Sequence, residues 1–413
     1  MAKSIIFITE FGFSKRDTAR YGLNVLRKRG LNTRVLDIAK LTREGYIEGH
    51  DELDITDINN LESIGNNQKL KSILSSLTNE DIIICLVETR KESEFLFDML
   101  NENSLIYGFI FFGELPLLPS KNLSVVAISS LHTRIVSRIK LNYLSAIKEL
   151  INKYLLLIEI KNFFKRLFIK SKFQPKFVFV SGLKAYKKAK ISFFNVDCAI
   201  INTHSLDYDN FIDIKEKEPL FSSERYVTFL DDYKPYHPDN LVMNTGENLN
   251  NDSSPEDYYS ELNEFFNFFE EKEDIKILIA AHPRADYKNL AFKPFQDREI
   301  HYNKTAELIR GCKFVLGHNS ASLGIAAVLN KPILLLNSDT FSAYNRNYVD
   351  LFSKELGVGV VNISNRNQYR EEDYCLISES NLYKEYIAQY IKYKETSEIN
   401  SWDFFVNSIQ KLF

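Results

Sequence analysis

Residues 275–339 decide the fold, with the segments IKILIAAHPRADY (275–287) and TAELIRGCKFVLGHNSASLGIAAVLNKPILLLNSD (305–339). Apolar runs of strand length alternate with helical patterns, and the strands are expected at 275–281, 313–316 and 333–336. The helices are expected at 305–310 and 323–329. Because such alternation is typical of parallel sheets built from β-α-β units, the stretch predicts an α/β domain.

Polar residues follow the first two of these strands. His282-Pro283-Arg284 ends the first strand, because proline has no N–H to donate to a neighbouring strand. GHNSAS (317–322) ends the second, with small residues that cap a helix and direct backbone N–H groups outward. Open parallel sheets bind ligands at the carboxyl ends of their strands, beside helix N-termini that favour phosphate. We therefore predict a phosphate site here.

The same residues carry a resemblance to known enzymes. A strand ending in HPR, followed by TAELI, FVLGHNSAS and AAVLNKPILLL, resembles the C-terminal half of GT-B glycosyltransferases that build bacterial capsule and lipopolysaccharide. The similarity extends over about residues 175–340 and is greatest to the group that includes Kdo and bacterial sialic acid transferases. It implies a GT-B fold, in which two Rossmann-like α/β domains face a central cleft.

The resemblance also implies an activity. It points to transfer of a sugar from a nucleotide-activated donor, with a CMP-linked 2-keto acid such as Kdo or a nonulosonate as the donor sugar. The acceptor would be a growing surface glycan or a lipid-linked glycan. In the family, the His-Pro motif and a downstream serine pair contact the donor phosphate. Nucleotide and phosphate binding is therefore assigned to His282, Pro283, Arg284, Thr305, His318, Asn319, Ser320 and Ser322.

Two other functions stay open. A CDP-polyol phosphotransferase of the teichoic-acid type has a similar C-terminal half with His-Pro and paired serines, but transfers a phosphoryl group. A non-catalytic polysaccharide-assembly protein of the same fold is the other alternative.

Length and composition bound the protein class. The 413 residues suit two domains, which we place at 1–219 (acceptor side) and 220–413 (nucleotide-sugar side, with helices that cross back). A hydrophobic content of 45% and a charged content of 26% are typical of soluble globular proteins. The net charge of −3 argues against nucleic acid as a partner. No apolar run reaches the roughly 18–20 residues that span a bilayer, so we expect a cytoplasmic protein.

The remaining elements follow the same rhythm. In the first domain, strands are expected at 4–10, 32–38, 81–87, 105–112, 125–129, 177–180 and 197–201, with one helix between the first two. In the second domain, a strand at 226–230 precedes a helix with Ser254 as N-cap and Pro255 at its first position. A helix at 341–356, a strand at 359–363 and helices at 382–393 and 402–413 complete the chain.

An acidic pair provides the candidate general base. Asp231 and Asp232 end the strand at 226–230, and His237 lies close by in the sequence. Related sialyltransferases carry an acidic pair followed by glycine, and one acid acts as base; here Tyr233 stands in place of the glycine. Deprotonating an acceptor hydroxyl requires such a base, so these three residues are the catalytic candidates.

Metal and redox chemistry receive little support. Asp207-Tyr208-Asp209 matches the DxD pattern that holds a divalent cation in GT-A enzymes, but the two-domain α/β rhythm favours GT-B, for which we predict no metal or other cofactor. Neither a GxGxxG, P-loop or GxSxG motif nor a His/Cys metal-binding spacing occurs. Four dispersed cysteines, which we predict to be inert thiols, are Cys85, Cys198, Cys312 and Cys375.

The segment 133–173 differs from the rest of the chain. Between residues 134 and 172, ten basic and two acidic residues give a net charge of +8, whereas the remainder of the protein carries −11. Leu, Ile and Phe are interleaved with the basic residues. This combination favours a helical surface that contacts an anionic membrane, on its inner face, and the alternative is a solvated helix between domains.

Overall fold

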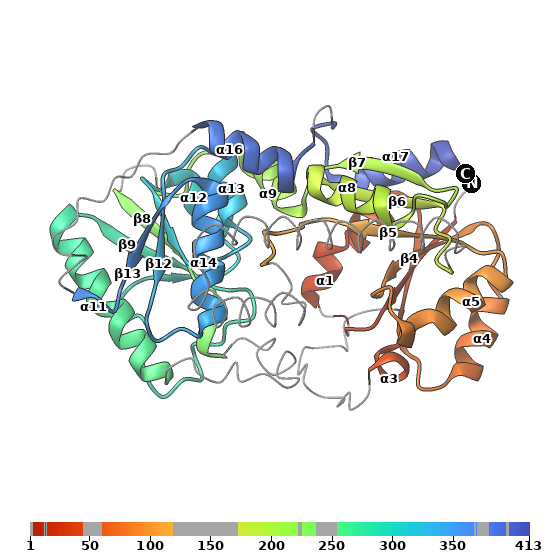
Figure 1. Ribbon diagram of the computed structural model, residues 1–413, viewed down its shortest axis with the longest axis horizontal. Helices are drawn as coiled ribbons and strands as arrows, with labels where there is room; N and C mark the ends of the chain where they lie inside the picture. Colours follow the sequence, from red (N-terminus) through yellow and green to blue (C-terminus); the bar gives the residue numbers. More distant parts are fainter. Residues whose placement is uncertain are drawn as a thin grey trace, which may run out of the picture.

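The structure is a computed structural model. It describes residues 3–43 apart from 12 and 14, and residues 60–118, 172–221, 225–236, 254–366, 369, 380–393 and 396–413. Two parallel sheets, each with its own layers of helices, lie side by side, and helices α8, α9, α16 and α17 run along one edge of the pair (Figure 1).

Seven strands form the first sheet, in the order β3-β2-β1-β4-β5-β6-β7, and every neighbouring pair is parallel. Such strands are buried on both faces, which explains their continuous apolar sequences. All five side chains of β6, for example, are buried. The strands are β1 (Ser4–Thr9), β2 (Asn32–Asp37), β3 (Leu61–Ser63), β4 (Asp81–Leu86), β5 (Ile106–Phe111), β6 (Phe177–Ser181) and β7 (Ala199–Thr203).

Helices pack on both faces of this sheet. One face is covered by α4 (Asn67–Ser75), α5 (Glu94–Glu102) and α8 (Gly182–Ser192). The other is covered by α2 (Leu23–Lys28) and by α17 (Ser401–Leu412), which comes from the end of the chain. Short helices at α1 (Lys15–Arg20), α3 (Ala39–Thr42) and a 3₁₀ turn at Lys91–Ser93 connect the strands.

The single helix predicted between β1 and β2 is wrong, because Gly22 divides it into α1 and α2. Gly22 has φ of 60° and lies against the indole of Trp402 on α17. A Cβ at this position would stand 2.1 Å from the indole ring, so only glycine allows α17 to approach this closely.

The second sheet repeats the topology of the first. Its order is β10-β9-β8-β11-β12-β13, and all neighbouring pairs are parallel. The chain thus builds outward from β8 in one direction and then from β11 in the other. The strands are β8 (Tyr226–Leu230), β9 (Lys276–Ala280), β10 (Ile300–His301), β11 (Val315–Gly317), β12 (Ile333–Asn337) and β13 (Gly359–Asn362).

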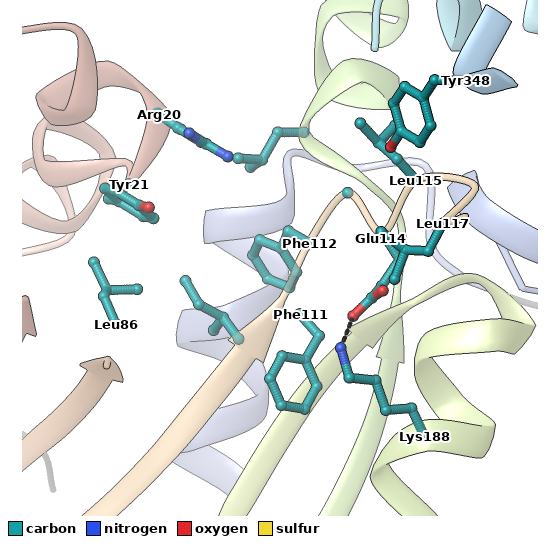
Figure 2. Close-up of a pocket in the computed structure, with 13 residues that line it drawn as sticks. Arg20, Tyr21, Leu86, Phe111, Phe112, Glu114, Leu115, Leu117, Lys188 and Tyr348 are labelled. Atoms are coloured by element: carbon teal, nitrogen blue, oxygen red, sulfur yellow. Dashed lines mark hydrogen bonds and ion pairs between the residues drawn. The ribbon is translucent and has the colours of Figure 1, made fainter. Parts of the chain in front are cut away.

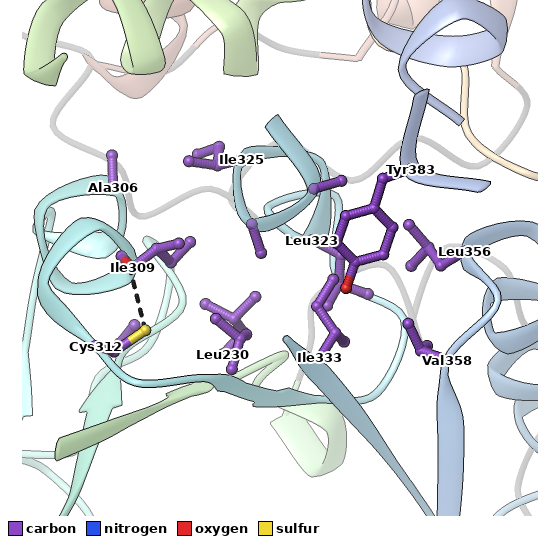
Figure 3. Packing of buried hydrophobic residues seen from close by; sticks show 14 of the residues in the cluster. Leu230, Ala306, Ile309, Cys312, Leu323, Ile325, Ile333, Leu356, Val358 and Tyr383 are labelled. Atoms are coloured by element: carbon purple, nitrogen blue, oxygen red, sulfur yellow. Dashed lines mark hydrogen bonds between the residues drawn. The ribbon is translucent and has the colours of Figure 1, made fainter. Parts of the chain in front are cut away.

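The long helix α11 (Pro255–Glu273) covers one face of the second sheet. It begins as predicted, with the Ser254 hydroxyl accepting a hydrogen bond from the Asp257 N–H at 3.1 Å. On the other face lie α9 (Leu206–Ile214), α12 (Thr305–Gly311), α13 (Leu323–Val328), α14 (Ala343–Leu356) and α16 (Ser380–Tyr386), the last continued by a π-helical turn at Ile387–Ile391. Figure 3 shows the apolar layer between these helices and the strands.

Two helices pack against a domain other than the one that precedes them in the chain. α9 follows the last strand of the first sheet yet packs against α12 and α13 of the second domain. α17 packs in the opposite sense, with Trp402 and Phe405 buried in the core of the first domain. The two α/β domains with parallel sheets confirm the predicted fold class.

Several predictions fall outside the described residues: the strand at 125–129, all but residues 172 and 173 of the segment 133–173, His237 and Cys375. β3, β10 and α9 were not predicted, because they are short or lack a clear apolar period.

Cys85, Cys198 and Cys312 are free thiols. Burial raises the pKa of Cys312 to about 11, so this thiol is inert at neutral pH.

Candidate functional site

The candidate site lies where the strand order of the second sheet reverses. β8 and β11 are parallel neighbours, and their last paired residues are Leu230 and Gly317. The residues that follow, Asp231-Asp232 and His318-Asn319, therefore emerge at the same edge of the sheet. The connections after β8 and β11 lead to opposite sides, which opens a crevice at the carboxyl ends of open parallel sheets.

Asp231 is the buried member of the acidic pair. Its carboxylate accepts hydrogen bonds from the N–H of Tyr233 at 2.8 Å, the N–H of His282 at 3.1 Å and the hydroxyl of Tyr287 at 2.5 Å. Burial raises the pKa of Asp231 to about 6, against the opposing effect of these three hydrogen bonds. Because both oxygens are engaged inside the protein, Asp231 is a positioning residue that holds the turn after β9 against β8.

Asp232 is the partly exposed member of the pair. Its Oδ2 lies 3.4 Å from the backbone nitrogen of Asn319, across the reversal point of the sheet. Of the two predicted bases, Asp232 is therefore the one whose carboxylate reaches solvent at the carboxyl edge.

Lys234 adds a positive charge that sequence reasoning missed. It begins a 3₁₀ turn at Lys234–Tyr236, its ammonium donates to Oδ1 of Asn319 at 2.8 Å, and it stands 5.1 Å from the ring centre of Phe341. A lone lysine gives no motif. The available signal was its place, two residues after the aspartates at a strand end.

The His282-Pro283-Arg284 segment forms a tight turn after β9. The N–H of Ala285 donates to the carbonyl of His282 at 2.9 Å, and the N–H of Arg284 donates to Nδ1 of the His282 ring at 3.2 Å. With Nδ1 acting as an acceptor, the ring proton sits on Nε2, and an Nε2–H group is the type of donor that binds an anionic oxygen. Pro283 is exposed, and Arg284 is half-buried.

His318 does not reach the crevice with its side chain, so direct ligand contact by its ring is contradicted. The ring is fully buried, with Nδ1 donating to the carbonyl of Leu336 at 2.6 Å and Nε2 accepting from the Tyr258 hydroxyl at 3.0 Å. Burial, assisted by the charge of Lys234, lowers the pKa of His318 to about 3. The neutral ring ties β11 to β12 and α11.

The predicted hydroxyl residues occupy two different helix starts. Ser320 and Ser322 are half-buried in the turn before α13, where the Ser320 hydroxyl accepts from the N–H of Ser322 at 3.4 Å. Thr305 is the first residue of α12, whose N-cap is Lys304, and its half-buried side chain stays a candidate contact.

A second polar cluster, also missed from the sequence, lies at the ends of β12 and β13. Oε2 of Glu261 on α11 accepts from the hydroxyls of Ser338 at 2.8 Å and Ser364 at 2.9 Å. The Ser338 and Thr340 hydroxyls are 2.5 Å apart. These residues are separated by up to 103 positions, so no local pattern could group them.

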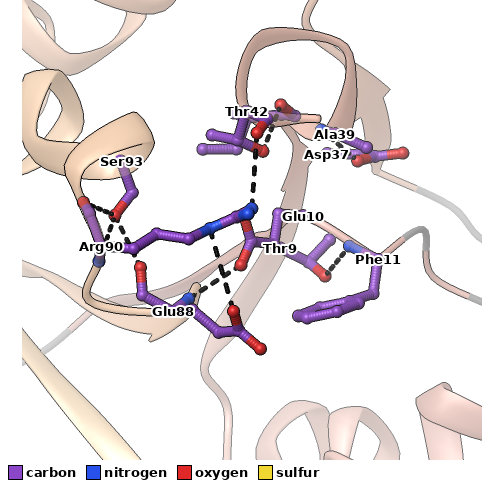
Figure 4. A network of polar contacts seen from close by, with 10 residues as sticks. Thr9, Glu10, Phe11, Asp37, Ala39, Thr42, Glu88, Arg90 and Ser93 are labelled. Carbon is purple, nitrogen blue, oxygen red and sulfur yellow. Dashed lines mark hydrogen bonds and ion pairs between the residues drawn. The ribbon is translucent and has the colours of Figure 1, made fainter. Parts of the chain in front are cut away.

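The first sheet has a polar cluster at its own reversal point, between β1 and β4 (Figure 4). Glu10 is fully buried there, and its Oε2 lies 2.6 Å from Nη2 of Arg90. The N–H of Glu88 donates to the other oxygen at 2.9 Å. This pair fixes the loops that follow β1 and β4.

Among the described residues, no group of three or more His, Cys, Asp or Glu side chains is arranged to hold a metal ion. The carboxylate of Asp209, from the DxD-like tripeptide, accepts hydrogen bonds from the N–H of Ser401 at 2.8 Å and from its hydroxyl. Within the same described ranges, no helix has the length and hydrophobicity required to cross a bilayer.

The two sheets with reversed strand order, facing each other as two domains, decide the fold type. The fold is GT-B.

No family model matches the sequence, and no curated protein matches it. Three solved structures are similar to this chain, each at low sequence identity. The wall teichoic acid polymerase TagF, as its H444N variant, is 12% identical with a TM-score of 0.47, covering 99% of this chain and 88% of that chain.

The calicheamicin glycosyltransferase CalG4 is 12% identical with a TM-score of 0.45, covering 100% of this chain and 98% of that chain. The UDP-GlcNAc 2-epimerase of Methanocaldococcus jannaschii, in complex with UDP-GlcNAc and UDP, is 11% identical with a TM-score of 0.44, covering 100% of both chains. At this distance the likenesses carry no argument about activity or substrate, which must come from the site of this GT-B chain itself.

Proposed function

We propose that the protein is a glycosyltransferase that uses a nucleotide-activated sugar, bound at the carboxyl edge of the second sheet, to extend a surface glycan. The observation that carries the proposal is the group of charged and polar side chains at the β8–β11 reversal point. Asp232, Lys234 and Asn319 lie together there, and Asp231 fastens the His282 turn to the same edge.

The charges suit a departing phosphate. Lys234, Arg284 and the Nε2–H of His282 supply cations and a donor at one edge, where phosphate groups of nucleotides bind in open α/β sheets. Ser320 and Ser322 add hydroxyls from the turn before α13. The serine and glutamate cluster at the ends of β12 and β13 offers hydrogen-bonding partners for the hydroxyls of a nucleoside.

Transfer then requires one base. The Asp232 carboxylate takes the proton from the acceptor hydroxyl as the acceptor oxygen bonds to the anomeric carbon. The bond between that carbon and the donor phosphate breaks, and the electron pair leaves with the nucleotide. Lys234, Arg284 and His282 neutralise the charge that develops on the phosphate. The step needs no metal ion.

For the donor, we propose a CMP-linked 2-keto sugar acid such as Kdo or a nonulosonate, as the HPR and GHNSAS motifs imply. Thermal shift with CMP, CDP, UDP, GDP and dTDP tests the nucleotide, because a ligand at 100 times its Kd adds about 2.7 kcal/mol to stability. Stabilisation by CMP and CDP alone is expected. Stabilisation by UDP or GDP alone would overturn the choice of nucleotide.

Product analysis separates this activity from its rivals. A glycosyltransferase releases CMP and leaves no phosphate on the product, whereas a CDP-polyol phosphotransferase leaves one phosphate in each new linkage. Intact donors after incubation, together with no nucleotide-dependent shift, would identify a non-catalytic assembly protein.

We also propose that residues 134–172 hold the enzyme on the inner face of the membrane. The support is the +8 charge interleaved with apolar residues, and each basic residue near an anionic surface adds about 1 kcal/mol. Wild type should co-sediment with anionic vesicles at low salt, less so at high salt. Reversing the charges of Lys161, Lys165, Arg166 and Lys170 to Glu should abolish binding, and no co-sedimentation of wild type would refute the proposal.

A further inference from the structure

A pocket of about 440 Å³ lies at the carboxyl ends of β4 and β5, on the side of the first domain that meets the second (Figure 2). Most of its lining comes from the first domain, and Leu206 of α9 and Tyr348 of α14 close it from the second-domain side. This pocket shares no residue with the proposed nucleotide site at β8 and β11. A volume of this size is within the range of small-molecule sites.

One part of the wall is apolar and aromatic. Leu86 ends β4, and the chain after β5 contributes Phe112, Leu115 and Leu117. Leu117 is 67% exposed, so part of this apolar surface is open to solvent rather than packed into the core. Such a wall suits the flat, less polar face of a sugar ring or a short apolar group.

Among the described residues, two basic side chains line the pocket, and one of them has a carboxylate partner. Lys188 of α8 pairs with Glu114 at 2.6 Å and stands 5.4 Å from the ring centre of Phe111. Arg20, at the end of α1, lies on the other side of the pocket in Figure 2, 5.6 Å from the ring centre of Tyr21. In the part of the chain that the structure describes, no carboxylate pairs with the Arg20 guanidinium.

Among the described residues, the pocket therefore presents one cation without a carboxylate partner beside an apolar wall. A guanidinium binds carboxylate or phosphate oxygens through two parallel hydrogen bonds, a geometry that a neutral hydroxyl cannot reproduce. The backbone of Arg20 is also fixed, because its carbonyl accepts from the indole N–H of Trp402 at 3.0 Å. The base of this side chain is thus held in place without using its charged end.

We infer that this pocket binds the acceptor and that Arg20 selects acceptors bearing an anionic group, a carboxylate or a phosphate, next to a ring that packs on the apolar wall. The inference rests on the proposed glycosyl transfer, because it gives the acceptor a site separate from that of the nucleotide. A carboxylate would come from an acidic sugar residue, and a phosphate from a phosphorylated glycan or the phosphate of a lipid carrier.

Binding of small probes tests the inference without donor or turnover. Methyl glucuronide, glucose 6-phosphate and methyl glucoside present a carboxylate, a phosphate and no charge on similar rings. Calorimetry or ligand-observed NMR should detect one or both anionic probes and give much weaker binding of the neutral one. Preference for glucuronide indicates an acidic sugar, and preference for the phosphate ester indicates a phosphorylated acceptor. No binding of either anion at about 20 mM would overturn the inference.

Variants locate the site. Arg20→Met keeps most of the side-chain length and removes the charge, and it should weaken the anionic probe about 10- to 100-fold. Arg20→Lys should retain part of the affinity, and Lys187→Met, at an exposed lysine of α8 that does not line the pocket, should change nothing. Equal losses for neutral and anionic probes, or an unchanged affinity in Arg20→Met with a wild-type melting temperature, would refute the role of Arg20.

The nucleotide provides an independent readout. Because Arg20 lies outside the β8–β11 site, Arg20→Met should keep the nucleotide-induced thermal shift of wild type. If the protein binds anionic sugars through Arg20 but binds no nucleotide, the Arg20 site is supported and the proposed glycosyl transfer is refuted. If it binds nucleotide but no anionic probe, the Arg20 site is refuted and the proposed function is unaffected.

Discussion

The backbone N–H of His282 donates to Oδ2 of Asp231 at 3.1 Å, which fastens the turn after β9 to the end of β8. The same oxygen accepts from the Tyr287 hydroxyl, and the other oxygen accepts from the N–H of Tyr233. Two adjacent aspartates at one strand end thus have different tasks, since Asp231 is enclosed by donors and Asp232 is partly exposed.

Asp231→Ala should destabilise the fold, because it leaves buried donors without an acceptor, at about 1–3 kcal/mol for each one left unpaired. Asp232→Asn should stay within about 0.5 kcal/mol of wild type and lose transfer while still binding nucleotide. Urea unfolding at pH 8 and a transfer assay measure the two effects. A stable, inactive Asp231→Ala together with an active Asp232→Asn would reverse the assignment.

Nucleotide affinity should depend on Lys234 and His282. Lys234→Met and His282→Ala should each cost about 1.5–3 kcal/mol of binding, the loss expected for one charge-assisted hydrogen bond, and Ser320→Ala should weaken binding as well. Lys313→Met is the matched control, because Lys313 is an exposed lysine of the same domain at the opposite end of β11. Unchanged calorimetric affinity in the Lys234 and His282 variants would remove the phosphate site from this edge.

Burial of the neutral His318 ring should make the stability of the protein depend on pH. Its folded pKa of about 3 lies below the unfolded value of 6.5, so the unfolded chain takes up a proton first as pH falls. Stability is therefore complete above about pH 6.5 and declines as the pH drops toward 3. Asp231 has a folded pKa of about 6, above its unfolded value of 3.8, so the folded chain takes up this proton first. Its protonation therefore increases the stability of the protein as the pH falls from about 6 to 4.

Comparing wild type with His318→Asn separates the two groups, since Asp231 is common to both proteins. The stability difference between them should shrink from pH 7.5 to pH 5, as measured by urea unfolding, because only wild type loses the contribution of the neutral ring. Parallel curves would mean that His318 is not held neutral by burial. Nucleotide affinity per folded molecule should change less than in His282→Ala.

Local sequence predicted the strands well because their burial on both faces leaves continuous apolar runs, as in β8 and β12. The cap of α11 was also predictable, since Ser254 and Asp257 interact within one turn. The roles of His282 and His318 were not separable, because both follow a strand. Their difference depends on Tyr258, which is 60 residues before His318 and fills the space beside its ring.

Transfer activity should survive EDTA without added Mg²⁺ or Mn²⁺. The DxD-like pair lies in the first turn of α9, where Asp209 is buried and already accepts two hydrogen bonds from Ser401. A cation would have to displace both of them. Loss of activity on chelation that Mn²⁺ or Mg²⁺ restores would contradict the metal-independent mechanism.

The contact between Asp209 and Ser401 should control how firmly the start of α17 is attached to α9. Asp209 is 8% exposed and Ser401 fully buried, and the ring of His204 lies 3.7 Å from the same carboxylate, in the segment that leaves β7. Ser401→Ala removes the hydroxyl donor and retains the backbone N–H donor, so a partly unsatisfied carboxylate should cost about 1–3 kcal/mol. Burial already raises the pKa of Asp209, and the loss of a donor should raise it further.

That variant should unfold at lower urea and become more susceptible to proteolysis ahead of α17, while nucleotide affinity at the β8–β11 edge stays within twofold of wild type. Gln410→Ala, at an exposed position of the same helix, is the control and should change stability by about 0.5 kcal/mol or less. Wild-type stability and protease resistance in Ser401→Ala would show that the Ser401 hydroxyl does not contribute to holding α17.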